Sequence, residues 1–155
     1  MVKNHTSVKL THIIVRLCYV ILGALCVALP VILTKGFFSF DVLYSIKGYV
    51  LTAFYLVVPA GYAALVCLDK ILINVKKDRI FEYENTGFLR IISYACFYAA
   101  IVGLVFFVLV LLNGTMFETL IILASGEFFM GLVVRVVKNI FTSAIKIKEE
   151  NELTI

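Results

Sequence analysis

Four long runs of apolar residues divide the chain, and short polar or aromatic segments separate them. The runs cover residues 13–33, 50–73, 89–112 and 117–137. About 20 apolar residues in a helix cross the hydrocarbon core of a bilayer, because each residue advances the helix by about 1.5 Å. The pattern therefore predicts an all-α fold, in which four transmembrane helices form a bundle within a single integral membrane domain.

The connections between these spans differ in character. An aromatic loop is expected over 34–49, a charged loop over 74–88, and a minimal turn at 113–116 that makes the last two spans a hairpin. Beyond the fourth span, apolar residues continue to recur at spacings of three and four, which is the period of an amphipathic helix. The last helix should therefore extend into the cytosol as a tail over 138–150, with an apolar stripe made of Val137, Ile140, Phe141, Ala144 and Ile145.

Composition agrees with a membrane protein. Hydrophobic residues make up 63% of the chain and charged residues 15%, and the mean hydropathy is +1.06. A soluble domain is usually about half apolar and about a quarter charged, so water is not the main solvent of this chain. The net charge of +4 comes from basic residues clustered beside the spans, without the motif of a nucleic-acid-binding fold. Direct binding of nucleic acid is therefore not expected.

The distribution of Lys and Arg predicts the orientation. Cytoplasmic loops of membrane proteins carry an excess of these residues. Only Lys35 and Lys47 fall on one face, whereas the other face holds twelve of the 14 basic residues. We therefore expect a multi-pass protein of the cell membrane with both termini and the middle loop in the cytoplasm. The twelve residues are Lys3, Lys9, Arg16, Lys70, Lys76, Lys77, Arg79, Arg90, Arg135, Lys138, Lys146 and Lys148.

Residues with catalytic or metal-binding potential form no recognisable motif. The four cysteines all lie inside apolar runs without the spacing of metal ligands. No nucleophile and base pattern, zinc-binding helix motif or glycine-rich phosphate loop is present. The sequence predicts a protein that is not an enzyme and that uses neither a metal nor a cofactor.

One acidic residue, Glu127, lies at the middle of the fourth span. A carboxylate there is costly and usually faces the bundle interior or a water-filled cavity, and desolvation favours its protonated form. Tyr62 and Tyr98 fall at similar depth on the second and third spans, so we expect a buried polar cluster of these three residues. Such a cluster is either an interhelical hydrogen bond or a proton, cation or pH-sensing site.

Charged residues near the cytoplasmic ends of the four spans form a second candidate site. Arg16, Asp69, Arg90 and Arg135 each come from a different helix. They are expected to form a cytoplasmic charge ring in which Asp69 is the shared partner. The alternative is that each arginine extends to the lipid headgroups.

The middle loop and the tail resemble a known family. Residues 78–85 read Asp-Arg-Ile-Phe-Glu-Tyr-Glu-Asn and are followed by Leu-Arg-Ile at 89–91, while the chain closes with Glu-Glu-Asn-Glu-Leu-Thr-Ile at 149–155. These motifs are similar to those of the bacterial multi-pass membrane proteins called domain of unknown function 2975. With the four spans, the resemblance extends over essentially the whole chain.

This resemblance implies no established activity, but it does imply a type of partner. Members of the family are associated with small helix-turn-helix regulators, so a cytosolic transcription regulator is the expected partner. In the motif, Phe81 is expected to anchor the loop, and Glu84 and Asn85 to cap the third helix. Both motif regions should pack together as one inner platform. The candidates for docking a partner are Phe81, Glu84, Asn85, Ile140, Phe141 and Ile145.

Two functions are compatible with these features. The first is a membrane sensor or sequestering partner of a cytosolic regulator, which signals through the middle loop and the tail. The second is a small transporter, channel subunit or immunity protein that uses Glu127. Four short helices leave little room for a private pathway, so the second function favours a homo-oligomer.

Overall fold

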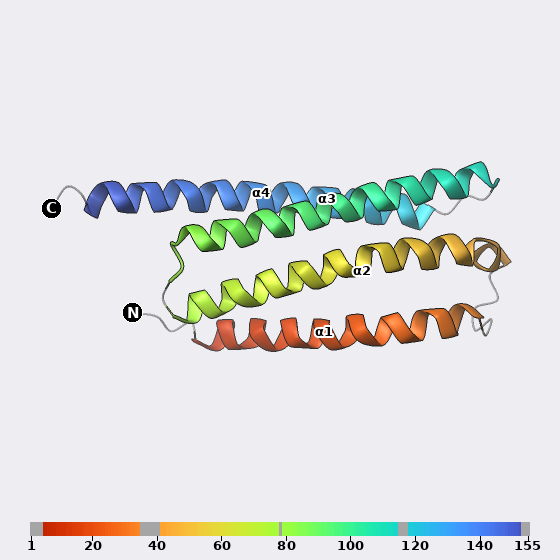
Figure 1. Ribbon diagram of the computed structural model, residues 1–155, viewed down its shortest axis with the longest axis horizontal. Coiled ribbons are helices and arrows are strands. Elements are labelled where there is room, and N and C mark those ends of the chain that lie inside the picture. The colour runs from red at the N-terminus through yellow and green to blue at the C-terminus, as the bar shows by residue number, and fades with distance from the viewer. Residues whose placement is uncertain (1–4, 35–40, 78, 115–117, 153–155) are drawn as a thin grey trace.

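Four helices make up the part of the chain that the structure describes, which comprises residues 5–34, 41–77, 79–114 and 118–152 of a computed structural model (Figure 1). Each of the four is long and apolar enough to cross a membrane. The predictions of an all-α fold and of four apolar spans are therefore confirmed. The helices are α1 (His5–Thr34), α2 (Asp41–Lys76), α3 (Tyr83–Leu112) and α4 (Glu118–Glu152).

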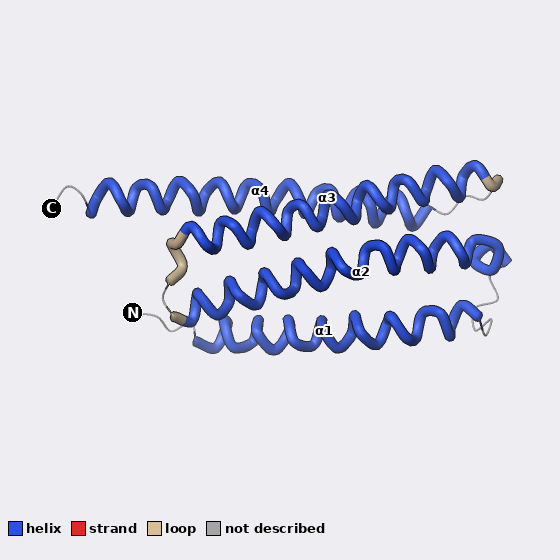
Figure 2. The backbone as a smooth tube through the Cα atoms, in the orientation of Figure 1, coloured by secondary structure: helices blue, strands red, loops and turns tan. Residues whose placement is uncertain are grey.

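The helices extend beyond the apolar runs. A helix of 30 residues is about 45 Å long, whereas the hydrocarbon core is about 30 Å thick. Since α2 begins at Asp41, the later part of the predicted aromatic loop is helical, while its phenylalanines at 37, 38 and 40 lie outside the described residues. Figure 2 shows that little of the charged loop remains outside the helices, because α3 begins at Tyr83. The continuous α4 confirms that the last helix extends past its apolar run.

Helices adjacent in sequence pack against each other and run in opposite directions. Contacts join α1 to α2, α2 to α3, and α3 to α4, and within the described ranges no contacting pair joins α1 to α3 or α4. Figure 1 shows the start of α1 and the end of α4 on the same side as the α2–α3 loop. We call this side the termini end. The apolar side chains of α1 that α2 does not cover are left for lipid to cover.

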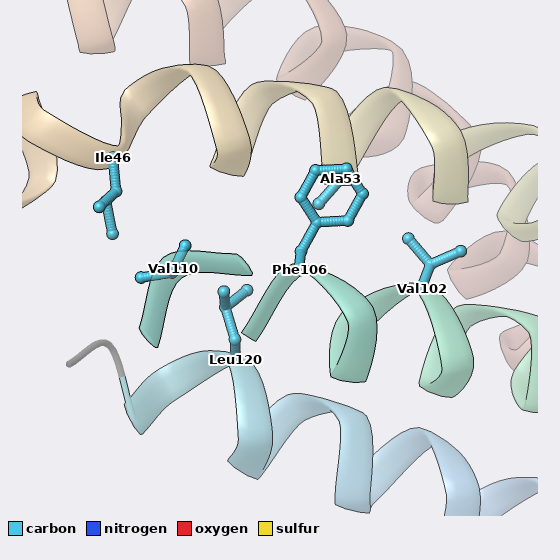
Figure 3. Close-up of a cluster of buried hydrophobic side chains, with 6 residues drawn as sticks. All are labelled: Ile46, Ala53, Val102, Phe106, Val110 and Leu120. Atoms are coloured by element: carbon cyan, nitrogen blue, oxygen red, sulfur yellow. The ribbon is translucent and has the colours of Figure 1, made fainter. Parts of the chain in front are cut away.

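A hydrophobic cluster at the opposite end joins α2, α3 and α4 (Figure 3). Phe106 projects toward Ala53 of α2, and Tyr49 packs against the same cluster. The side chain of Asn113 at the end of α3 donates hydrogen bonds to the Tyr49 hydroxyl at 3.0 Å and to the Leu109 carbonyl at 2.8 Å. The buried members of the cluster are Ile46, Ala53, Val102, Phe106, Val110 and Leu120.

Small residues bring α3 and α4 close together. A Cβ atom added to Gly103 would lie 3.1 Å from the Cβ of Ala124, and one added to Gly131 would lie 2.9 Å from the Phe97 ring. The buried Ser93 hydroxyl donates a hydrogen bond of 3.0 Å to the Gly131 carbonyl. In lipid, apolar side chains gain little by leaving their solvent, so this close approach is what stabilises the helix pair.

The Gly103→Val variant tests this contact. The added carbons meet the backbone and Cβ of Ala124, which cannot rotate away, so we expect a loss of about 1–3 kcal/mol in the free energy of unfolding. Unfolding in mixed micelles by increasing the denaturing detergent fraction measures it. Gly126→Val is the matched control, because a Cβ at Gly126 meets nothing within 4 Å and both variants make the same change in helix propensity. Equal losses in the two variants would contradict the close α3–α4 contact.

Candidate functional site

The three residues of the predicted buried polar cluster lie at three different helix interfaces. The Tyr62 ring lies 6.0 Å from the Tyr19 ring on α1. The Tyr98 hydroxyl donates to the Leu56 carbonyl on α2 at 3.3 Å. Within the described chain, neither phenol hydrogen-bonds to Glu127. Counting from the helix ends predicts the depth of a residue but not the side of the helix on which it lies, so the expected cluster is not formed.

Glu127 instead lines an apolar groove with a volume of about 300 Å³. Its side chain is exposed, and the Cys96 thiol of α3 lies close enough to interact with it. Because the rest of the wall is apolar, the groove is suited to an aliphatic group or to a partner helix that presents one donor to the carboxyl group. The other wall residues are Leu29, Val50, Ala53, Phe54, Val57, Ala99, Val102, Gly103, Leu120, Leu123 and Ala124.

The predicted charge ring is divided into two parts. Asp69 lies beside His12 of α1, with 3.2 Å between Oδ1 and Nε2, and it is not the shared partner of the arginines. Arg16 is exposed. Arg90 and Arg135 line a common pocket between α3 and α4. The ring does not close because, in the described part of the chain, α1 contacts only α2, whereas these two arginines belong to the α3–α4 pair.

A buried pair of asparagines holds the α2–α3 loop. Asn85 is fully buried, and its amide nitrogen donates to the carbonyls of Arg79 and Ile80 at 2.9 Å each. Its side-chain oxygen accepts a 2.8 Å hydrogen bond from Asn74 at the end of α2. Asn85 was predicted to cap α3, but helix capping is not its role. It satisfies the polar backbone of the loop and joins that loop to both helices.

Two acidic residues, Glu82 and Glu84, accept further hydrogen bonds at the loop. The N-cap residue of α3 is Glu82, and its side chain makes no capping hydrogen bond. Glu82 instead accepts a 2.6 Å bond from the guanidinium of Arg79, which raises the pKa of Arg79 above its ordinary value. Glu84 lies in the first turn of α3, where negative charge is favourable, and accepts a 3.3 Å bond from Asn74.

The loop also contacts the tail of α4. The rings of Phe81 and Phe141 lie 6.1 Å apart, and the Tyr83 hydroxyl donates a 3.0 Å bond to Glu149. The prediction that the two motif regions pack together is therefore confirmed. We call residues 79–85 together with Phe141, Ile145 and Glu149 the inner platform. Asp78 of the loop motif and the last three residues of the tail motif lie outside the described residues.

The predicted docking residues fall into two groups. Asn85 and Ile145 are buried, so they are not available to a partner. Phe141 is half-buried behind Phe81. Phe81 is 47% exposed and Ile140 is 61% exposed, so one large apolar side chain on the platform and one beside it remain accessible. Glu84 is also exposed.

Sequence reasoning missed three residues that make these contacts. His12 is a weak signal, because a single histidine in a basic flank has no obvious partner. Asn74 looked like the first residue of a loop, although a polar residue directly after an apolar run is a site where a helix end needs hydrogen bonds. Glu149 belongs to the tail motif, but only the tertiary structure places it against Tyr83.

A protein-family model matches most of the chain. The model of the family described as Protein of unknown function (DUF2975) matches residues 39–155. The match includes α2, α3, α4 and the inner platform and leaves out α1, so it is narrower than the predicted resemblance over the whole chain. No curated protein and no solved structure matches the chain.

The Asn85→Ala variant tests the asparagine pair. It leaves the Arg79 and Ile80 carbonyls without their donor, and the Asn74 amide keeps only its bond to Glu84, so we expect a loss of about 1–3 kcal/mol in stability. Hydrogen exchange should also become faster at the amides of residues 79–85. Asn139→Ala on the exposed side of α4 is the control and should leave both measurements unchanged. Unaltered exchange in Asn85→Ala would show that the loop does not depend on this side chain.

Proposed function

Because this chain belongs to the family described as Protein of unknown function (DUF2975), which carries no assigned activity, we propose a function from the inner platform. The chain is a membrane protein without enzymatic activity that senses a change in its helices or sequesters a regulator. Its partner is a cytosolic helix-turn-helix transcription regulator, which docks on the inner platform and the exposed side chains beside it. The termini end then faces the cytoplasm of a bacterial cell.

One observation carries this proposal. The inner platform joins segments 66 residues apart in sequence, and it lies at the junction of α2, α3 and the far end of α4. A shift of α4 along α3 would move Phe141 and Glu149 relative to the loop. The platform would therefore change shape when the packing of the spans changes, which is the property a membrane sensor needs.

Charge and exposure support the position of the partner. Twelve of the 14 basic residues belong to the flanks and the loop at the termini end, which is the distribution of a cytoplasmic face. Phe81 and Ile140 expose apolar surface beside these charges. Accessible aromatic and aliphatic side chains with polar neighbours are typical of protein docking sites.

Capture of partners from membranes tests the proposal. The full chain should retain a helix-turn-helix protein that a chain ending at residue 137 loses. The double variant Phe81→Ala and Ile140→Ala should weaken capture by about tenfold or more, because it removes two apolar contacts without shortening the chain. Lys146→Ala, at an exposed position of the same tail, is the control. If the truncated chain retained the same partners as the full chain, the regulatory function would be ruled out.

The groove at Glu127 favours a second candidate function, that of a transporter, channel subunit or immunity protein. The observation behind it is a carboxyl group at mid-span in an otherwise apolar wall. Such a group binds a proton or a cation at a large desolvation cost, and that cost is tolerated where it serves a pathway. The groove is open, so a second copy of the chain would have to close the pathway.

Ion flux into proteoliposomes tests this second function. If Glu127 carries the ion, Glu127→Gln should lower the flux of protons or sodium about tenfold or more, since the amide keeps the shape but not the charge. Glu118→Gln, at the exposed first turn of the same helix, should retain the flux. Equal flux in all three proteins, or none in the wild type, would exclude this function.

A further inference from the structure

Three basic side chains meet in a cleft between α3 and α4 at the termini end. One cavity of about 40 Å³ is lined by Arg90, Arg135 and Lys138, and a second of about 260 Å³ shares Arg90 and Lys138 in its wall. No carboxylate lines either cavity. Within the described ranges, none of the three side chains forms an ion pair. We call these three residues and the two cavities the basic cleft.

Two other cations near this end have partners in the structure. Arg79 is bonded to Glu82, and the Lys70 ammonium lies 5.3 Å from the centre of the Phe88 ring. The three cations of the cleft instead surround an open space. Like charges near one another repel, and an anion bound among them relieves this repulsion.

One uncharged group of the wall has a hydrogen that it can donate to an anion. The hydroxyl groups of Thr86, Ser93 and Thr142 donate their hydrogens to backbone carbonyls. Tyr94 also lines the smaller cavity, and within the described chain its hydroxyl has no hydrogen-bond partner. The cleft therefore offers two guanidinium groups, one ammonium group and one phenol as donors. Guanidinium groups match the oxygen geometry of phosphate and bind it in pairs of parallel hydrogen bonds.

We propose that the basic cleft binds the phosphate group of an anionic phospholipid. The cleft lies where the apolar runs of α3 and α4 reach the termini end, which is the depth of the headgroups. Ile91 and Val136 directly adjoin Arg90 and Arg135 in sequence, and they are 45% and 58% exposed. Acyl chains would cover these apolar side chains while the phosphate lies among the cations. A free phosphate ion would contact only the cations and would leave these apolar side chains uncovered. Basic pockets between transmembrane helices commonly bind such headgroups.

Native mass spectrometry of the full chain in neutral detergent tests the proposal. The probes are phosphatidylglycerol, phosphatidylcholine and inorganic phosphate. Wild type should retain phosphatidylglycerol at least about tenfold more tightly than phosphatidylcholine. The triple variant Arg90→Gln, Arg135→Gln and Lys138→Gln should lose this preference, because each basic group near an anionic headgroup adds to the affinity.

A second triple variant distinguishes binding in the basic cleft from a general attraction between basic residues and anionic lipid. Lys76→Gln, Lys77→Gln and Lys146→Gln remove the same charge from exposed positions at the same end and should retain the preference. Equal losses in both triple variants would refute the cleft. Tight binding of inorganic phosphate, with displacement of the lipid, would refute the lipid as ligand. The double variant Arg90→Lys and Arg135→Lys keeps the charge and should retain part of the affinity that the triple glutamine variant loses. Unfolding of each variant is measured without lipid, to show that a loss of binding is not a loss of fold. This inference is independent of the proposed regulatory partner.

Discussion

The close approach of α3 and α4 positions both the inner platform and the basic cleft. Lipid is as apolar as the side chains that contact it, so this pair depends on small residues and one buried hydrogen bond instead of on exclusion of water. Gly103 lies against Ala124, and Ser93 is bonded to the backbone at Gly131. Because α4 is a single helix from Glu118 to Glu152, these contacts also determine where its tail meets the loop.

The loop between α2 and α3 is held in one conformation by its hydrogen bonds, so a movement of one helix also moves the other. A buried amide group must form hydrogen bonds, because leaving it without partners is costly. The Asn85 side chain forms them with the loop backbone and with Asn74. The ends of α2 and α3 are therefore fixed relative to each other. By contrast, among the described helices α1 contacts only α2, and these contacts include His12 beside Asp69 and the hydroxyl of Tyr55 on the Cys26 carbonyl at 2.8 Å. It also lies outside the matched family region.

Side-chain chemistry at the termini end could be predicted only in part. The family-like motifs correctly indicated that the loop and the tail meet, and Phe81 with Phe141 shows how. The sequence did not reveal the role of each side chain within these motifs. Asn85 carries the same polar group whether it caps a helix or holds a loop, and only its surroundings separate the two. Arg90 and Arg135 were assigned to a ring around Asp69, because the sequence gives their depth but not the helix pair to which each belongs.

The sequence by itself determined that the chain forms four long apolar helices and that the last one continues past its span, because hydropathy and helical period are local properties. It also located the two motif regions. Only the tertiary structure decided which residues face each other. It separated Glu127 from Tyr62 and Tyr98 and brought Arg90 to Arg135. The physical reason is that apolar side chains on every side of a helix suit a bilayer, so the pattern does not reveal which side is packed against protein. The choice is made by small residues such as Gly103 and by a few hydrogen bonds.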